Sequence, residues 1–287
     1  LGCLAELTKD PHTRIRARTM LARLGLSSAL HIHPGIGCWA GPFSRAYRPA
    51  VFNADAFNVD HVRAWVDDGL LPFWIADLLK RSDVPEQIDE TAHGEEPVAL
   101  STYHSPSFSL GVASCELKTQ QIIFIALQSN VFFAQYRRPD NASCGVLFSR
   151  YILDDQWLNF QTTPSRGPGQ VVPEEGHFYG VHERGRTIGL YAPHGLDGWT
   201  RRTSAKAVLV WTEVEQIEEI WIGQHKVDAL PVKVPPGEVV VVGSGGLWTA
   251  VLPLELTDLG GGAPIRLVEL GGHLALEMHN YTGPAKT

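Results

Sequence analysis

The sequence changes character near residue 95, and this change limits the folds that the chain can adopt. Before it, the residues favour helices and tight loops, whereas after it short segments rich in β-branched and aromatic residues alternate with Gly, Pro or Asp. Helices followed by many short strands indicate an α+β fold with an antiparallel sheet, because a βαβ fold would need helices between the strands. We therefore expect a helical segment at residues 1–95 and an antiparallel β-sandwich or stacked-sheet domain at residues 96–287.

The helical segment contains two stretches with helix signals. The first is predicted to begin at Asp10, a capping residue, with Pro11 at the first helical position, and to end before Pro34. The second begins at Asp60, and Pro72 divides it into two helices. The apolar face of the first helix is predicted to contain Ile15, Leu21 and Leu24.

The β region contains strand-sized segments separated by turn residues. The acidic run at residues 213–219 is the one place in this region where we expect a helix or a charged loop. The predicted strands lie at residues 107–115, 121–128, 131–137, 146–153, 176–182, 187–191, 207–212, 239–242, 247–252 and 273–281.

The charge balance bears on the kind of ligand. With 24 Lys and Arg against 31 Asp and Glu, the net charge is -7, which argues against a nucleic-acid partner because such binding needs clustered basic residues. A few converging arginines can still create a local site for an anionic ligand. No run approaches the roughly 18 apolar residues of a membrane helix, so we expect no membrane partner.

Other features bear on the compartment. The four cysteines contain no CxxC pair, so buried thiols are favoured over a zinc knuckle or a disulfide. Two glycosylation sequons begin at Asn141 and Asn280, which fits a secreted or periplasmic protein. The chain begins at Leu1 without an initiating Met, so we expect a processed, truncated or incomplete N-terminus.

A Gly- and Pro-rich loop at residues 34–49 is the first candidate site. Arg45, supported by Arg48, can clamp a carboxylate, and Tyr47 can transfer a proton. Trp39 and Phe43 offer flat apolar faces on which sugar rings can pack. The alternative is structural: the arginines pair with neighbouring carboxylates, and two histidines interact with the negative end of the helix dipole. The aromatic and titratable residues of this region are His31, His33, Trp39, Phe43, Arg45, Tyr47 and Arg48.

The dipeptide Tyr103-His104 is the second candidate. On a regular strand the two side chains point to opposite faces, with Tyr103 half-buried and His104 solvated. If the stretch before Pro106 bends, both can enter one cleft, and His104 is then the better candidate for proton transfer.

A third group contains His177, His182 and His194. With Asp197 these residues are candidates for a structural metal site, although exposed or core histidines are the simpler interpretation. We otherwise expect no cofactor.

Two segments resemble a known group of enzymes. The loop Gly-Pro-Phe-Ser-Arg-Ala-Tyr at residues 41–47, followed by a long β region, and the glycine-rich tail at residues 240–254 are similar to the C-terminal half of (α/α)-toroid polysaccharide lyases of the heparinase II/III, chondroitin and alginate lyase type. The resemblance implies that residues 1–95 are the end of a helical toroid that lies mostly upstream. The Asn-His pairing usual in the helical part of such lyases is absent.

The resemblance also implies a reaction, the β-elimination of a uronate-containing polysaccharide. A proton next to a carboxylate becomes acidic enough to remove only when the carboxylate charge is offset. Arg45 would offset that charge, Tyr47 or Tyr103 would act as base or acid, and His33 or His104 would share the proton transfer.

Two other functions remain open. A glycoside hydrolase would need two carboxylates beside the scissile bond. A non-catalytic carbohydrate-binding or structural module would use exposed tryptophans, which otherwise fill the core. The residues available for these two functions are Asp55, Asp60, Asp154, Asp155, Glu174 and Glu175, and Trp157, Trp199, Trp221 and Trp248.

Overall fold

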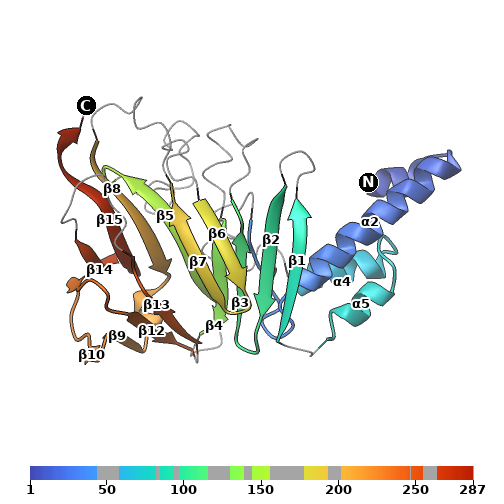
Figure 1. Cartoon of the computed structure of the whole chain (residues 1–287). Helices are drawn as coiled ribbons and strands as arrows, with labels where there is room; N and C mark the ends of the chain where they lie inside the picture. Colours follow the sequence, from blue (N-terminus) through green and yellow to red (C-terminus); the bar gives the residue numbers. More distant parts are fainter. Residues whose placement is uncertain are drawn as a thin grey trace.

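The protein has a helical layer at one end of a large antiparallel β structure (Figure 1), which confirms the predicted α+β class. The computed structural model describes residues 1–43, 58–81, 85–92, 97–115, 130–138, 144–155, 178–192, 202–245, 247–254 and 264–286. Among these residues, no helix combines the length and the apolar character that crossing a membrane requires.

The helices begin near the predicted residues. The backbone N–H of Thr13 donates to Asp10 at 2.8 Å, so the predicted cap of α2 is confirmed. Asn58, and not Asp60, caps α4, because the Asn58 side chain accepts from the backbone N–H of Asp60 at 3.0 Å. A break at Pro72 separates the last two helices, as predicted. The described helices are α1 (Gly2–Leu7), α2 (Pro11–His31), α4 (Val59–Asp67) and α5 (Trp74–Leu78).

The buried face of α2 differs in part from the prediction, although Leu21 packs against the core of the helical layer as expected. Ile15 and Leu24 are 63% and 55% exposed, whereas the small residues Gly25 and Ala29 are buried. A Cβ atom on Gly25 would lie 2.7 Å from Leu71, so this face of α2 lies too close to the segment between α4 and α5 for larger side chains. Contact between Gly25 and the side chain of Leu71 is therefore part of what buries this face.

The main sheet has nine antiparallel strands with β1 at one edge and β11 at the other. Their order in the sheet is β1 (Glu86–Ala92), β2 (Val98–His104), β3 (Phe108–Ala113), β4 (Phe132–Arg137), β5 (Cys144–Leu153), β8 (Arg202–Trp211), β15 (His273–Lys286), β14 (Ile265–Leu270) and β11 (Val232–Val234).

Strand β1 lies within the segment that was expected to be helical, so the β structure begins earlier than residue 95. Among the described strands it is an edge strand that pairs with β2 alone, and its side chains alternate between half-buried and exposed. Because most of its residues are polar, the strand lacks the apolar alternation that marks a half-buried strand.

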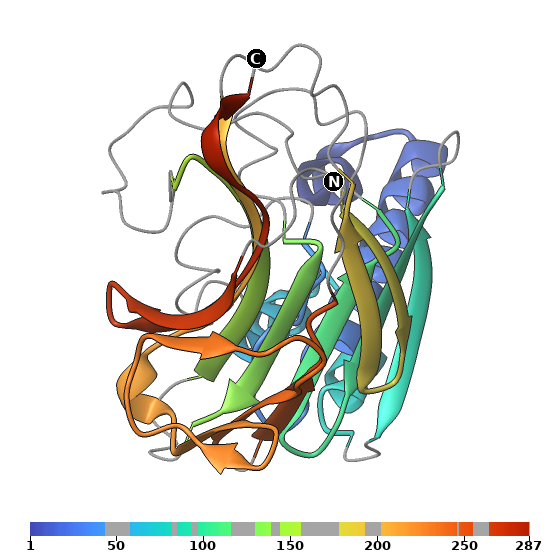
Figure 2. The same ribbon diagram turned by 60° about the vertical axis from the view of Figure 1, so that its left-hand side comes forward.

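One face of the nine-stranded sheet packs against two smaller sheets. The indole N–H of Trp211 donates to Thr249 at 3.1 Å, which joins β8 to the four-stranded sheet across an apolar core. The predicted charged interruption is the short 3₁₀ helix η4 (Val214–Gln216). The four-stranded sheet has the order β10 (His225–Lys226), β9 (Glu219–Ile222), β12 (Val240–Ser244) and β13 (Leu247–Val251), and the hairpin that lies over β2 and β3 (Figure 2) is formed by β6 (Phe178–Glu183) and β7 (Arg186–Tyr191).

The other face of the nine-stranded sheet, which we call the loop face, is defined by one row of cross-strand partners. The row runs through seven neighbouring strands, from β2 to β14. A second row, two residues further along the strands, places Arg150, Val208, Glu277 and Arg266 next to one another. The first row consists of Thr102, Gly111, Phe133, Phe148, Val210, Ala275 and Val268.

Candidate functional site

The two predicted segments on either side of residue 95 meet on the loop face. The hydroxyl of Thr102 donates to the carbonyl of Gly41 at 2.7 Å, and the amide of Gln135 donates to the carbonyl of Trp39 at 2.9 Å. Both donors are buried, so each of these carbonyls replaces water as the partner of a polar side chain. These bonds fix the path of residues 38–43 across β2, β3 and β4.

The same segment touches the sheet backbone directly at Gly111. A Cβ atom at this position would lie 1.9 Å from the carbonyl oxygen of Gly41 and 2.4 Å from the nitrogen of Pro42. Only glycine allows such an approach, so the height of the loop above β3 is set by the absence of a side chain.

The two predicted aromatic contacts, Trp39 and Phe43, are half-buried and lie next to each other. Their ring centroids are 5.9 Å apart in an edge-on arrangement, and the ring of Phe43 lies 5.0 Å from that of Phe133 on β4. Trp39 also packs against the core of the helical layer, whereas Phe43 packs against the core of the sheet. Their partly exposed rings remain candidates for contact with a sugar.

His33 is buried and holds the loop with both ring nitrogens. Its Nδ1 accepts from the backbone N–H groups of Gly35 and Ile36, each at 2.9 Å, so its Nε2 carries the proton and donates to the carbonyl of Ser105 at 2.7 Å. Burial lowers the pKa of His33 and keeps the ring neutral.

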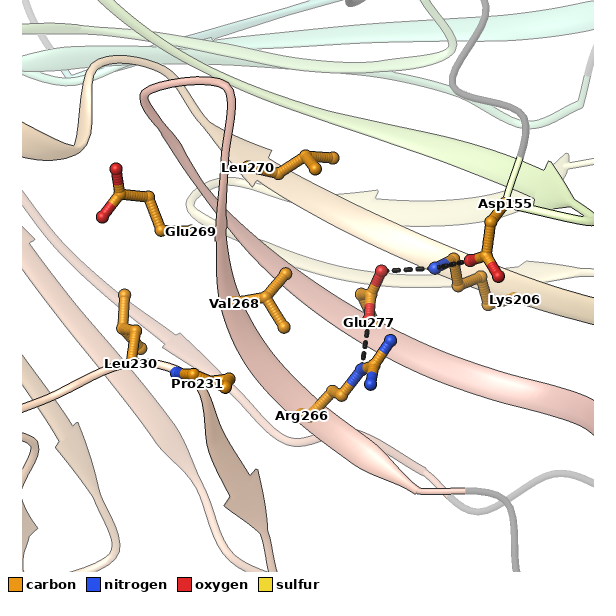
Figure 3. A pocket seen from close by; sticks show the side chains of 9 residues that line it. All are labelled: Asp155, Lys206, Leu230, Pro231, Arg266, Val268, Glu269, Leu270 and Glu277. Atoms are coloured by element: carbon orange, nitrogen blue, oxygen red, sulfur yellow. Dashed lines mark hydrogen bonds and ion pairs between the residues drawn. The ribbon is translucent and has the colours of Figure 1, made fainter.

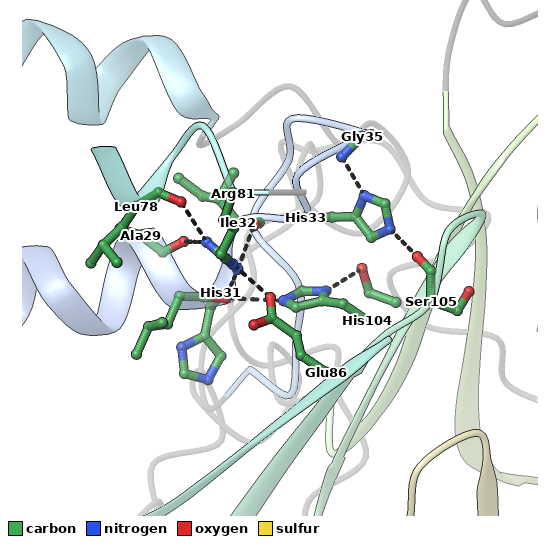
Figure 4. Close-up of polar contacts among 12 residues, drawn as sticks. Ala29, His31, Ile32, His33, Gly35, Leu78, Arg81, Glu86, His104 and Ser105 are labelled. Atoms are coloured by element: carbon green, nitrogen blue, oxygen red, sulfur yellow. Dashed lines mark hydrogen bonds and ion pairs between the residues drawn. The ribbon is translucent and has the colours of Figure 1, made fainter. Parts of the chain in front are cut away.

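His104 is also buried and fully hydrogen-bonded (Figure 4), and it is not solvated as the strand interpretation expected. Its Nε2 donates to the carbonyl of Leu30 at 3.0 Å, and its Nδ1 accepts from the hydroxyl of Ser109 at 3.1 Å. Burial lowers the pKa of His104 to about 3. The His33 and His104 rings lie 5.4 Å apart. Because both nitrogens of each ring are hydrogen-bonded, proton transfer by either ring would first require one of these hydrogen bonds to break.

Arg81 is a central residue of this region that the sequence did not reveal. It donates to the carbonyls of Ala29 at 2.6 Å and Ile32 at 3.1 Å, and it pairs with Glu86 of β1 at 2.6 Å (Figure 4). The carbonyl of Leu30 accepts from both Arg81 and His104. The carbonyls at the end of α2 are thus joined to β1 and β2 through the guanidinium of Arg81 and the imidazole of His104.

Tyr103 lies on the opposite face of the sheet from His104, as strand alternation requires. Its ring is 5.9 Å from that of Phe108 and lies beside the β6–β7 turn at Gly185. Tyr103 and His104 therefore cannot act on one substrate from the same side.

Several predicted residues lie outside the part of the chain that the structure describes. They include three residues of the loop, Arg45, Tyr47 and Arg48, and three of the metal candidates, His177, His194 and Asp197. Of the metal candidates, only His182 is described; it is half-buried, and burial lowers its pKa. Within the described ranges, no three His, Cys, Asp or Glu side chains form a group that could hold a metal ion.

A second polar feature of the loop face lies far from the helices, in a cleft of about 420 Å³ (Figure 3). Lys206, Glu277 and Arg266 lie in it on three neighbouring strands, with Asp155 just after β5. Of these residues only Asp155 was a candidate from the sequence. The other residues could have been predicted, because a single charged residue within an apolar strand, as in Ala205-Lys206-Ala207, indicates a buried ionic group.

Comparisons with protein-family models, with curated protein sequences and with solved structures gave no match. The function of this chain is therefore argued from the geometry of the loop face.

Proposed function

We propose that the protein is a carbohydrate-active enzyme that cleaves a uronate-containing polysaccharide by β-elimination. The observation that carries the proposal is the position of residues 38–43, which are fastened across the loop face with two half-buried aromatic rings. The face continues from these rings over β5, β8 and β15 to the charged cleft. A polymer can lie along such a surface with apolar and ionic contacts to successive sugars.

In the proposed reaction, the chain must offset the charge of a carboxylate and remove the neighbouring proton. We assign these tasks to Arg45 and Tyr47, which follow the fastened segment in sequence. His33 and His104 support the proposal as positioning residues, because their hydrogen bonds fix the loop and the end of α2.

Hydrolysis by paired carboxylates is less favoured by the described residues. Asp155 and Glu277 share the ammonium of Lys206, which keeps their carboxylates within about 5 Å of each other, the spacing of a retaining glycosidase. However, the hydrogen bond from Lys206 lowers the pKa of Asp155, whereas a general acid needs a raised pKa. Asp55, Glu174 and Glu175 lie outside the described residues.

One observation favours a non-catalytic carbohydrate-binding module. Trp248 on β13 is 55% exposed, and its indole lies next to Gly243 of β12. On the same face of the four-stranded sheet, Trp221 of β9 donates to Glu219 at 2.8 Å. Two indoles on one sheet face are a suitable platform for sugar rings. Trp157 and Trp199 lie outside the described residues.

The reaction is tested by incubating the protein with a panel of uronate-containing polysaccharides. Elimination produces an unsaturated uronate with ultraviolet absorbance, hydrolysis produces reducing ends without that absorbance, and a module binds without either signal. Only the first result supports the proposal.

A substitution tests the assigned residue. We expect Arg45→Ala to lower turnover by about 10²- to 10³-fold, as loss of one charge-stabilising group does, with an unchanged circular dichroism spectrum. Arg63→Ala is the matched control, because Arg63 is an exposed arginine on α4 that pairs with Asp60. Full activity of Arg45→Ala would exclude its assigned role.

A further inference from the structure

The cleft of about 420 Å³, whose lining residues are drawn in Figure 3, lies on the loop face at the end of the nine-stranded sheet opposite the helices. Its walls combine an ionic group with apolar side chains. The apolar part consists of Leu230 and Pro231 on one side and Val268 on β14. Such a mixture of a few polar groups and an apolar wall is typical of a ligand site.

The ionic group is built around a buried lysine. The side chain of Lys206 is 1% exposed, and its ammonium contacts the carboxylates of Asp155 at 2.5 Å and of Glu277. Glu277 is itself 4% exposed, and its other oxygen accepts from Nε of Arg266 at 2.5 Å. Burying these charges costs free energy that apolar residues would not cost, so the network calls for an explanation beyond stability.

The network ends in a guanidinium that is open to the cleft. The side chain of Arg266 is 43% exposed, and Glu277 engages its Nε. In the described part of the chain, no acceptor binds its two terminal nitrogens. Lys206 orients Glu277 and Glu277 orients Arg266, so the free edge of the guanidinium is held in place before a ligand arrives.

We propose that this cleft is a carboxylate-binding subsite that takes a uronate unit of an anionic polysaccharide. The carboxylate accepts two hydrogen bonds from the terminal nitrogens of Arg266, and an apolar face of the sugar ring packs against Val268 and Pro231. The proposal rests on the proposed function, because it names a second point at which the same substrate is held.

The charges of the network permit an anionic ligand. The two cations, Lys206 and Arg266, balance the two carboxylates, Asp155 and Glu277. Glu269 lies at the rim, and its carboxylate points away from the network in Figure 3. An incoming carboxylate therefore meets the positive edge of Arg266 first, and planar recognition by a fork of two N–H groups favours carboxylates.

The position of the cleft suits a polymer. Four strand spacings separate Phe133 on β4, below the aromatic segment, from Val268 on β14, which is roughly 19 Å along the sheet. A single sugar cannot contact both places, whereas an oligosaccharide of several units can. The cleft is therefore separate from the surface formed by Trp39 and Phe43.

The binding is tested by titrating the intact chain with glucuronate, with glucose and inorganic phosphate as comparison probes. We expect glucuronate to bind and Arg266→Gln to weaken its binding at least about tenfold. Arg266→Lys, which keeps the charge but loses the fork, should give an intermediate loss and serves if Arg266→Gln folds poorly. The matched control is Arg23→Gln, because Arg23 is an exposed arginine that pairs with Glu90 of β1, at the opposite edge of the sheet from the cleft.

Each outcome decides for or against the subsite. Absence of glucuronate binding, equal binding by Arg266→Gln, or equal binding of glucose would overturn it. Phosphate binding as tight as that of glucuronate would overturn the uronate assignment and leave a general anion site.

A turnover assay separates this proposal from the proposed function. Glucuronate binding that depends on Arg266, without unsaturated product from any polysaccharide, would retain the subsite and remove the lyase activity. Turnover with an unchanged KM in Arg266→Gln would retain the activity and remove the subsite.

Discussion

The buried histidines show how strongly the surroundings of a residue decide its role. From the sequence, His33 and His104 were candidates for proton transfer because histidine titrates near neutral pH. In the structure each ring is neutral, buried and engaged at both nitrogens, so each serves first to satisfy backbone carbonyls at the end of α2 and before β3.

The pKa of His104 predicts how stability depends on pH. Its pKa is about 3 in the folded protein against 6.5 for a free histidine, so the unfolded chain binds more protons below pH 6.5. The contribution to stability is therefore complete above pH 6.5 and is lost as the pH falls towards 3, by at most about 1.4 kcal/mol per pH unit.

Urea unfolding between pH 7 and pH 4 measures this dependence. His104→Gln should lower stability at pH 7 and flatten the dependence on pH. His12→Gln should change neither, since His12 is exposed in the folded protein. An equally steep dependence in His104→Gln would contradict the assignment.

At the level of single residues, contacts between residues close in sequence could be predicted, whereas contacts between residues far apart in sequence could not. The cap at Asp10 was predictable because its partner, Thr13, lies three residues away. Arg81 was not, because its partners include carbonyls about fifty residues earlier in the chain, which only the folded protein brings to it. Lys206 likewise depends on Glu277, on another strand.

Among the elements, the segment before Phe43 is joined to β2 and β4 by hydrogen bonds and contacts β5 through two thiols. The Sγ atoms of Cys38 and Cys144 are 3.9 Å apart, and all four cysteines are thiols. Oxidation would link the loop covalently to the sheet.

We expect oxidised glutathione to form a Cys38–Cys144 disulfide, with release of two molecules of reduced glutathione. The link closes a loop of 106 residues and should raise stability by up to about 4 kcal/mol. Peptide mapping and urea unfolding check this, with Cys38→Ser as the variant that cannot form the link and Cys3→Ser as the control. A map in which Cys38 and Cys144 remain unlinked would contradict the prediction.

The strands differ in how far the sequence reveals them. β4 was predictable, because its apolar and aromatic residues are buried on both sides. β1 was missed because it is a polar edge strand. β14 was missed although Ile265 and Leu267 are buried, because the charged residues Arg266 and Glu269 interrupt a short apolar pattern. The edge position and the length of a strand, and not its composition alone, decide whether it can be predicted from the sequence.

At the scale of the whole molecule, several polar groups join the helical layer to the sheet, and among them Glu90 of β1 accepts from Arg23 and Ser27 of α2. Arg81 binds carbonyls at the end of α2 and also Glu86 at the start of β1, and His104 of β2 binds Leu30. The two parts should therefore unfold together as long as this connection is intact.

Arg81→Met tests the connection. Loss of its charged hydrogen bonds leaves several carbonyls unsatisfied and should lower stability by about 2–4 kcal/mol. Tryptophan fluorescence and circular dichroism should report one shared transition in the wild type and separate transitions in the variant. Arg63→Met is the control, because Arg63 pairs with Asp60 within α4. Coincident transitions in Arg81→Met would show that the remaining contacts couple the two parts without Arg81.

The contact at Gly111 has a consequence for altering the specificity of the protein. Because backbone meets backbone there, the loop rests on β3 without an intervening side chain that could be shortened or lengthened. Substitutions of loop side chains can change what the surface recognises, while its depth stays constant. The backbone of β3 and of the loop sets the depth of the surface, and the side chains of the loop set its chemistry.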